Sequence, residues 1–326
     1  LEWFAEEGKR LYGDVIPTPM ADRRILTLKQ PIGVCAAITP WNFPNGMITR
    51  KAGPALAAGC PIIVKPASQT PLSALSLAVL AERAGIPGNI FQVVTGKASD
   101  IGTEFCTNPD IAKITFTGST EVGRKLLRSA ADQVLKPAME LGGNAPLIVF
   151  EDADLDTAVE GTMLAKMRNL GEACTAANRI YVHASVAEAY TAKLSAAMSA
   201  LKVGDGTDPS VDVGPLVNAD TRDTVAGFVE DAVAKGARIE CGGTAPDGKG
   251  YFYPPTVLSN VPETADCVGA EIFGPVAAIQ TFSDQNDVIR RANDTEYGLV
   301  AYVFSEDMKR ALQVCERLEY GMVGLN

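Results

Sequence analysis

The stretch Ala112-Lys-Ile-Thr-Phe-Thr-Gly-Ser-Thr-Glu-Val-Gly123 contains the pattern that decides the fold. Its first half, 112–116, is a short apolar segment typical of a buried strand. Its second half passes through Gly118 and Ser119 into a helix that we predict over 120–132. Small residues at such a junction let a phosphate approach the N–H groups at the positive end of a helix. The spacing is not Gly-x-Gly-x-x-Gly, so this segment alone fits either a nucleotide site or an ordinary capped helix.

Short apolar strands alternate with helices on both sides of this stretch. This rhythm predicts an α/β fold in which parallel sheets are covered by helices on both faces. The predicted strands are 33–38, 61–64, 91–94, 112–116, 136–141, 146–150 and 179–183. The predicted helices are 51–59, 71–85, 120–132, 152–164, 186–201, 225–235 and 284–292, with the end of another helix in 1–13. We expect an extended excursion or hairpin at 14–30, and loops at 204–222 and 242–250.

The segment Leu141-Gly-Gly-Asn144 marks the best domain boundary, because two glycines precede a fresh strand. A chain of 326 residues exceeds the usual size of one hydrophobic core. We therefore predict two α/β domains, 1–141 and 142–326.

The composition limits the class of protein. It is 47% apolar and 21% charged, and no apolar run reaches the ~20 residues needed to span a bilayer. The net charge of −10 argues against a general nucleic-acid binder. The seven cysteines form no Cys-x-x-Cys pair, and the first residues lack the features of a signal peptide. These properties predict a cytoplasmic protein without a disulfide framework.

Few residues are available for chemistry. The only histidine is His183, in a predicted strand, so we expect neither a histidine triad nor a metal site. Cys174 follows a helix across a glycine-containing break, where local N–H dipoles stabilise a thiolate, although many free cysteines are only small buried apolar residues. Lys65 follows a strand at its carboxyl end, the edge at which open α/β sheets bind ligands.

Six motifs along the chain resemble, in their order, the motif series of the aldehyde dehydrogenase superfamily. They are Pro40-Trp-Asn-Phe-Pro44, Lys65-Pro-Ala-Ser68, Phe116-Thr-Gly-Ser119, Glu140-Leu-Gly-Gly-Asn144, Gly171-Glu-Ala-Cys174 and Glu271-Ile-Phe-Gly-Pro275. The resemblance runs over essentially the whole chain. The longer matches at 48–59 and 166–169 look most like succinate-semialdehyde dehydrogenases, with glutarate-semialdehyde enzymes a close second.

The resemblance implies a Rossmann-like cofactor domain, which in this family lacks the usual glycine fingerprint, followed by an α/β catalytic domain. It also implies that Cys174 attacks the aldehyde carbon to form a thiohemiacetal. The side-chain amide of Asn42 and the backbone N–H of Cys174 would stabilise the oxyanion. After hydride transfer, a water molecule activated by Glu140 would hydrolyse the thioester.

The resemblance further assigns residues to an NAD(P)+ cofactor. Lys65 would bind the adenosine ribose, Glu271 the nicotinamide ribose and Gly118-Ser119 the pyrophosphate, and Phe273 would pack beside the nicotinamide. Thr39, Trp41, Ser68 and Val122 complete the predicted set. A glutamate at position 68 would repel a 2′-phosphate, whereas the neutral Ser68 favours NADP+ or dual use over strict NAD+ use.

Two arginines match those that bind the substrate carboxylate in succinate-semialdehyde enzymes. A guanidinium group pairs bidentately with a carboxylate, so Arg50 and Arg168 are the predicted substrate ligands. The alternative for Arg168 is a structural ion pair.

The chain also departs from the family. Ala176 stands where many relatives have a second cysteine, so we predict no local redox switch. The family's chains extend beyond both ends, so we expect a partial sequence. The excursion near 14–30 would serve oligomerisation, giving a homodimer or homotetramer in the full-length form. The rival interpretations are an inactive fragment, a thioester hydrolase and a CoA-acylating enzyme. The intact cofactor residues argue against the hydrolase, and Glu140 argues for release of a free acid.

Overall fold

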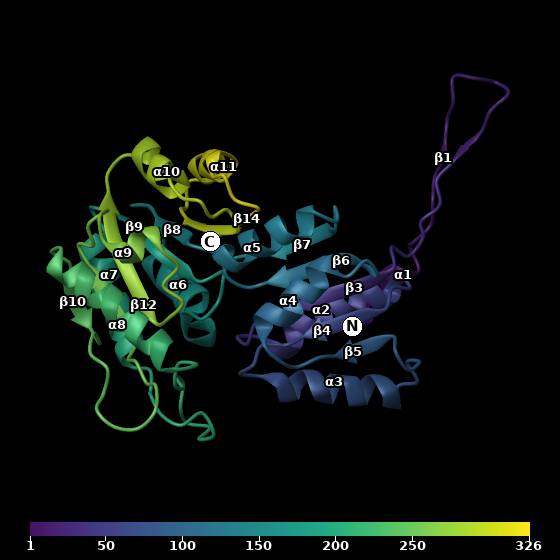
Figure 1. The fold of residues 1–326 in the computed structure, drawn as a ribbon. Coiled ribbons are helices and arrows are strands. Elements are labelled where there is room, and N and C mark those ends of the chain that lie inside the picture. The colour runs from purple at the N-terminus through teal and green to yellow at the C-terminus, as the bar shows by residue number, and fades with distance from the viewer. The chain divides into compact units, whose positions relative to one another are not determined.

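The computed structural model describes all residues from 1 to 326, which form two compact units, Leu1–Leu141 and Gly142–Asn326. Each unit has its own β-sheet with helices packed on it (Figure 1). None of the helices is both long and apolar enough to cross a membrane.

The sheet of the first unit has five parallel strands in the order β5-β4-β3-β6-β7. In chain order, β4 and β5 are added on one side of β3, and β6 and β7 are then added on its other side. The carboxyl ends of β3 and β6 therefore flank a topological switch point, where open α/β sheets bind their ligands. The strands are β3 (Val34–Ile38), β4 (Ile62–Lys65), β5 (Phe91–Val93), β6 (Ile111–Thr117) and β7 (Lys136–Glu140).

Helices cover both faces of this sheet, because successive residues of a strand point to opposite sides. Cys35 and Ala37 of β3 share a buried core with Ile48, whereas Ala36 lies in a second core with Phe105. The helices are α2 (Pro44–Ala57), α3 (Pro71–Arg83), α4 (Ala98–Thr107) and α5 (Thr120–Ala131). This arrangement agrees with the predicted α/β class.

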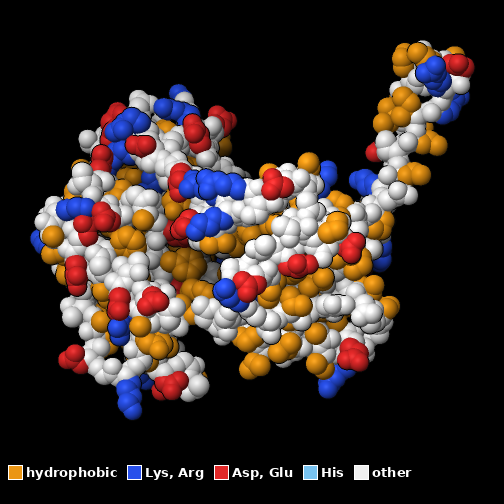
Figure 2. Space-filling view, in the orientation of Figure 1, with side chains coloured by type: hydrophobic (Ala, Val, Ile, Leu, Met, Phe, Trp, Pro, Cys, Tyr) orange, Lys and Arg blue, Asp and Glu red, His pale blue; other side chains and the backbone are white.

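A two-stranded ribbon extends from the first unit after the short helix α1 (Glu2–Gly8) (Figure 1). Its strands, β1 (Val15–Ile16) and β2 (Ile25–Leu26), pair antiparallel with Val15 opposite Leu26. The ribbon is the hairpin that the sequence predicts. It exposes apolar side chains to solvent, as the space-filling view shows (Figure 2). These are Val15, Ile16, Met20, Ile25, Leu26 and Leu28.

The second unit has a seven-stranded sheet in the order β10-β11-β12-β9-β8-β13-β14. Only β10 runs antiparallel to its neighbour. The strands are β8 (Ala145–Val149), β9 (Ala177–His183), β10 (Arg238–Cys241), β11 (Thr256–Ser259), β12 (Val276–Phe282), β13 (Val300–Phe304) and β14 (Met322–Leu325). The helices are α6 (Leu155–Met167), α7 (Ala187–Ser199), α8 (Ala219–Ala234), α9 (Asp266–Gly269), α10 (Gln285–Asn293) and α11 (Met308–Arg317).

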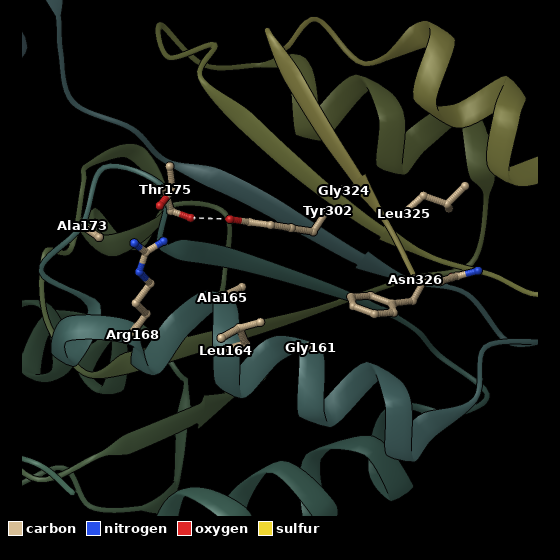
Figure 3. Close-up of a pocket in the computed structure, with 11 residues that line it drawn as sticks. Gly161, Leu164, Ala165, Arg168, Ala173, Thr175, Tyr302, Gly324, Leu325 and Asn326 are labelled. Atoms are coloured by element: carbon tan, nitrogen blue, oxygen red, sulfur yellow. Dashed lines mark hydrogen bonds between the residues drawn. The ribbon is translucent and has the colours of Figure 1, made fainter. Parts of the chain in front are cut away.

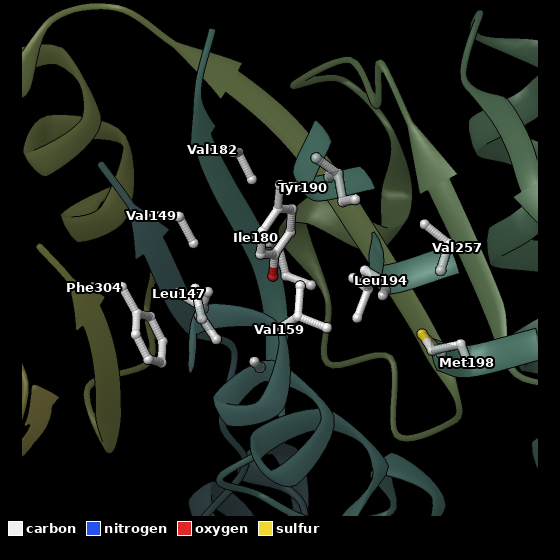
Figure 4. Packing of buried hydrophobic residues seen from close by; sticks show 14 residues of the cluster. Leu147, Val149, Val159, Ile180, Val182, Tyr190, Leu194, Met198, Val257 and Phe304 are labelled. Atoms are coloured by element: carbon white, nitrogen blue, oxygen red, sulfur yellow. The ribbon is translucent and has the colours of Figure 1, made fainter. Parts of the chain in front are cut away.

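The largest core of the second unit lies between its sheet and the helices α6 and α7 (Figure 4). Alternate residues of β8 and β9 point into it, including Leu147, Val149 and Ile180, which pack with Tyr190 and Leu194 of α7. The residues between them, such as Ile148, pack on the other face in a separate core. Burying apolar surface stabilises a fold by about 25 cal/mol per Å², so this core stabilises the sheet whose loops contain the candidate site residues.

Several elements differ from the sequence prediction. Helix α2 begins at Pro44, seven residues before the predicted start at 51, because Pro44 occupies the first helical turn, where the missing N–H has no cost. Helix α8 begins at Ala219, inside the predicted loop 204–222. The sequence prediction also missed α4, α9, α11 and the strands β10 to β14.

Candidate active site

The predicted residues of the first unit gather at the carboxyl edge of its sheet. Thr39, Trp41 and Asn42 follow β3, Lys65 and Ser68 follow β4, and Gly118 and Ser119 follow β6, while Glu140 is the last residue of β7. Backbone hydrogen bonds join the loops in pairs. Thr39 N–H donates to the carbonyl of Lys65 at 3.1 Å, and Gly118 N–H donates to the carbonyl of Glu140 at 3.1 Å. The fold thus brings four separate sequence motifs to one sheet edge.

Two buried hydroxyl groups at this edge have no hydrogen-bond partner, Thr39 Oγ1 and Thr117 Oγ1. They stand at the ends of β3 and β6, on either side of the switch point. A buried polar group left unpaired costs about 1–3 kcal/mol, so a ligand that forms hydrogen bonds with these two hydroxyls would gain affinity at this edge. This observation fits a polar ligand such as the ribose and phosphate groups of a dinucleotide.

Helix α5 begins at this edge. The N-cap residue Ser119 accepts a hydrogen bond from Val122 N–H through its hydroxyl at 3.4 Å. Capping aligns the first turn, whose N–H groups and dipole favour an anion. Lys65 adds a cation at the end of the neighbouring β4, and burial lowers the pKa of this lysine. The edge therefore offers positive charge and N–H donors to a phosphate group.

The other predicted residues of this unit differ in their exposure. Asn42 is half-buried, and its amide oxygen accepts the N–H of Phe43 at 3.1 Å, which orients the side chain. Glu140 is exposed. Arg50 is also exposed and lines, with Glu140 and Lys51, a cavity of about 370 Å³ in the first unit. Buried Lys51 donates to Thr115 Oγ1 at 3.0 Å, and burial lowers its pKa to about 8.

In the second unit Cys174 stands in the turn between α6 and β9. A short 3₁₀ segment, Arg168–Gly171, precedes it, and three successive residues there have positive φ: Asn169 (50°), Leu170 (61°) and Gly171 (75°). Such conformations cost of order 1 kcal/mol or more for residues other than glycine and persist only where the surroundings enforce them. The backbone that precedes the half-buried thiol of Cys174 is therefore held in a left-handed conformation over three residues.

Close backbone contacts join this turn to the other motifs of the second unit. A Cβ atom on Gly143 would lie 1.8 Å from the carbonyl oxygen of Cys174, and one on Gly171 would lie 2.3 Å from that of Gly274. Gly143 N–H also donates to Glu271 Oε1 at 3.1 Å. The glycine pair after β7, the thiol turn and the loop with Glu271 and Phe273 therefore meet around Cys174.

Two further ionisable groups are buried in this region. Burial raises the pKa of Glu271 to about 7, although the hydrogen bond from Gly143 and the charge of Lys166 act in the opposite direction. Burial lowers the pKa of Lys166 to about 7, and Glu271 opposes that shift. Burial also raises the pKa of Glu172, two residues before the thiol, to about 7.

A cavity of about 420 Å³ in the second unit borders the thiol turn (Figure 3). Ala173 and Thr175, the two neighbours of Cys174, line it together with Arg168. Tyr302 closes part of the wall and donates its hydroxyl to the carbonyl of Thr175 at 2.8 Å. The remaining wall is mostly apolar, from Gly161, Leu164, Ala165, Phe304, Gly324, Leu325 and Asn326. Arg168 thus supplies a guanidinium group to a cavity that both chain neighbours of Cys174 line.

Sequence reasoning missed Lys166, Glu172 and Asn178 as site residues. A signal for Lys166 is present in the sequence, because Ala158, Thr162 and Lys166 follow one another at intervals of four on the buried face of α6. A lysine on an apolar helical stripe indicates a buried charge. Glu172 offers no comparable signal, because its burial depends on the loop that contains Val217, 45 residues later in the chain.

Comparison with known proteins identifies the family. The family model described as "Aldehyde dehydrogenase family" matches residues 1–326. The chain belongs to the aldehyde dehydrogenase family. It is 55% identical over 326 residues to the Escherichia coli K12 succinate-semialdehyde dehydrogenase (NADP+), covering 100% of this chain and 68% of that protein. It is 54% identical to the glutarate-semialdehyde dehydrogenase of Pseudomonas aeruginosa, with the same coverage of each chain.

Solved structures agree with this membership. The crystal structure of succinate-semialdehyde dehydrogenase from Burkholderia pseudomallei matches with a TM-score of 0.98 at 54% identity, covering 99% of this chain and 67% of that one. The predicted resemblance and the aldehyde dehydrogenase fold are confirmed. The chain is an oxidoreductase of the family that oxidises aldehydes with NAD(P)+.

Proposed function

We propose that this aldehyde dehydrogenase oxidises an aldehyde that also bears a carboxylate, with succinate semialdehyde as the first candidate and glutarate semialdehyde as the second. The observation behind this proposal is the cavity beside the thiol turn, in which Arg168 provides a guanidinium group. Guanidinium binds carboxylate bidentately, and a mostly apolar wall strengthens such a pairing. The names of the related enzymes from Escherichia coli and Pseudomonas aeruginosa support the same substrate class.

The proposed nucleophile is Cys174. Its thiolate sulfur attacks the aldehyde carbon and forms a thiohemiacetal, whose oxygen becomes negatively charged. The side-chain NH₂ of Asn42 and the backbone N–H of Cys174 are the proposed donors to that oxygen. One preorganised donor of this kind is typically worth about 3–4 kcal/mol. The fixed backbone of 169–171 supports the proposal, because an oxyanion donor must not move during the reaction.

The proposed base is Glu140, at the end of β7. After the substrate carbon has lost its hydride, a thioester remains on Cys174. Glu140 takes a proton from a water molecule, and the resulting hydroxide attacks the thioester and releases the acid and the free thiol. The exposure of the Glu140 carboxylate supports this role, since water can reach it.

The cofactor, when bound, supplies the acceptor for that hydride. We propose that the carboxyl edge of the first sheet holds it. Lys65 would bind the adenosine ribose, and the small residues Gly118 and Ser119 at the start of α5 would bind the pyrophosphate. In the second unit Glu271 would accept hydrogen bonds from the hydroxyl groups of the nicotinamide ribose, and Phe273 would pack on the nicotinamide. The other proposed contacts are Thr39, Trp41, Ser68 and Val122.

The unpaired hydroxyls of Thr39 and Thr117 and the capped start of α5 support a ligand of this chemistry. At position 68 the neutral Ser68 supports NADP+ as the preferred cofactor, and the Escherichia coli relative is named for NADP+. The proposed location is cytoplasmic.

The first test is the absorbance of reduced cofactor formed by the purified chain with succinate semialdehyde and NADP+, with NAD+ and glutarate semialdehyde in parallel. We expect turnover with NADP+ that Cys174→Ala abolishes. The matched control is Cys241→Ala, which removes another half-buried thiol of the second unit. No turnover from the folded wild-type chain would contradict the proposal, and a higher kcat/KM for glutarate semialdehyde would transfer it to the second substrate.

The second test concerns Arg168. Replacing it with methionine should raise KM for succinate semialdehyde about tenfold or more, because an ionic hydrogen bond is worth about 1.5–3 kcal/mol. The KM for an uncharged aldehyde of similar length should stay unchanged. The control is Arg290→Met, which removes an exposed arginine of α10 that pairs with Asp287. An equal loss for both aldehydes would show that Arg168 only supports the fold.

A further inference from the structure

Lys166 is a fully buried lysine that the proposed reaction does not use. It lies on the inner face of α6 with 0% of its surface exposed, and its Nζ donates to Asn178 Oδ1 of β9 at 2.9 Å. Desolvating an ammonium group costs several kcal/mol unless other charges and hydrogen bonds compensate. An apolar side chain would fill this space without that cost, so the lysine calls for a role beyond packing.

The hydrogen bonds lead from Lys166 towards Glu271. The amide of Asn178 that accepts from Lys166 also donates through Nδ2 to the carbonyl of Gly143, at a long 3.5 Å. The N–H of the same residue, Gly143, donates to Glu271 Oε1 at 3.1 Å. One residue of backbone therefore links the buried lysine network to the carboxylate. The same glycine packs against the carbonyl of Cys174.

The charges of Lys166 and Glu271 are also coupled. Each stabilises the ionised form of the other, whereas burial favours the neutral form of both. The other titratable group that acts on Lys166 is the thiol of Cys267, whose pKa burial raises to about 11, so it is uncharged at neutral pH. Glu271 is thus the carboxylate whose charge acts on Lys166, and Lys166 is the cation whose charge acts on Glu271.

We propose that Lys166 is a positioning residue for Glu271: through Asn178 and Gly143 it holds the Glu271 carboxylate in the place where it accepts hydrogen bonds from the hydroxyl groups of the nicotinamide ribose. This inference rests on the proposed function, in which Glu271 contacts the cofactor. It assigns to Lys166 no contact with substrate or cofactor, and it predicts an effect on cofactor affinity and on the pH dependence of that affinity.

The test measures the dissociation constant of NADP+ by calorimetry across neutral pH, without substrate. Lys166→Met retains the length and apolar volume of the side chain but removes the charge and the donor. We expect the dissociation constant to rise about tenfold at neutral pH, the effect of one pKa unit, and binding to recover only at higher pH. Lys166→Gln retains a donor for Asn178 without the charge, so its loss of affinity should be smaller.

The matched control is Thr162→Val, one helical turn earlier on the same buried face of α6. It removes the 2.6 Å hydrogen bond between Thr162 Oγ1 and the hydroxyl of Tyr190 without touching the Lys166 network. It should lower the melting temperature but leave the dissociation constant and its pH dependence at the wild-type values. This separates a positioning role from a loss of stability.

Glu271→Gln separates the failure of this inference from that of the proposed function. If Glu271→Gln binds NADP+ as the wild type does, the proposed cofactor role of Glu271 is wrong. If Glu271→Gln weakens binding while both Lys166 variants keep wild-type affinity and pH dependence, only the role of Lys166 is overturned. If neither Lys166 variant folds, the pH dependence of the NADP+ dissociation constant is compared between the wild type and Glu271→Gln. The same pH dependence in both would overturn the inference.

Discussion

Glu172 is a buried carboxyl group two residues before the proposed nucleophile. Only 4% of its surface is exposed, and its Oε1 accepts the N–H of Val217 at 3.2 Å. Burial raises its pKa from the ordinary 4.5 to about 7. The folded chain therefore holds the proton more tightly than the unfolded chain does. The stabilisation from this proton is complete below pH 4.5 and is lost as the pH rises through about 7.

Glu172→Gln should therefore stabilise the chain in a pH-dependent way. Above pH 7 the wild type carries a buried carboxylate, at a cost of roughly 3 kcal/mol for a shift of this size. Glutamine cannot ionise, and its amide oxygen still accepts from Val217. Urea unfolding should show the variant more stable above pH 7 and equal to the wild type below pH 4.5. Glu160→Gln, on the exposed face of α6, is the control and should change neither value.

At the scale of residues, the sequence predicts the candidates that stand in loops next to strands. Cys174, Lys65 and Ser119 are recognisable because glycine, proline or small residues surround them and a strand or helix adjoins them. The supporting charges are harder to predict. Lys166 shares a helical spacing of four with Ala158 and Thr162, which is a weak signal of burial. The burial of Glu172 depends on the distant loop at Val217, which no local pattern indicates.

The ribbon of β1 and β2 exposes apolar residues that no other part of the chain covers, in keeping with the proposed role of 14–30 in oligomerisation. Val15 and Leu26 stand opposite each other, with 74% and 65% of their surfaces exposed. Replacing both with lysine should leave each unit folded, because neither side chain contributes to a core. Light scattering during gel filtration should then show a smaller oligomer than the wild type forms.

The control for the ribbon is Asp22→Lys, which lies in the connection between β1 and β2 and changes the net charge by the same two units as the double lysine variant. It should leave the oligomer intact, since the proposed contact is apolar. A wild-type chain that is already monomeric, or a double variant with the mass of the wild type, would remove the ribbon from the interface.

Among the helices, those with clear start and stop residues are predictable from the sequence, and those without them are not. Helix α3 begins at Pro71 as predicted and ends at Arg83, near the predicted end at 85, because a proline opens it and a glycine follows it. Helix α4 lacks such signals, because no proline opens it and Lys97 before it forms no side-chain cap, and Gly102 lies within it. The strand order around β3 depends on pairings between distant segments, which no local pattern encodes.

The preference for NADP+ or NAD+ can be measured through the thermal stability of the whole chain. A ligand that binds only the folded chain raises the free energy of unfolding by about 2.7 kcal/mol when its concentration is a hundred times its dissociation constant. The cofactor of higher affinity therefore produces the larger rise in melting temperature at equal concentration. Because Ser68 is neutral, exposed and close in sequence to Lys65, we expect the larger rise with NADP+.

Ser68→Glu should reverse that order. A carboxylate at position 68 repels the 2′-phosphate of NADP+ and accepts hydrogen bonds from the two free hydroxyls of the adenosine ribose of NAD+. The rise in melting temperature with NADP+ should therefore shrink, and the rise with NAD+ should grow. Gln69→Glu adds the same charge one residue later, also at an exposed position, and should leave the order unchanged. If both glutamates weaken NADP+ equally, the preference comes from the overall charge near Lys65. If neither does, the 2′-phosphate binds elsewhere and Ser68 does not select the cofactor.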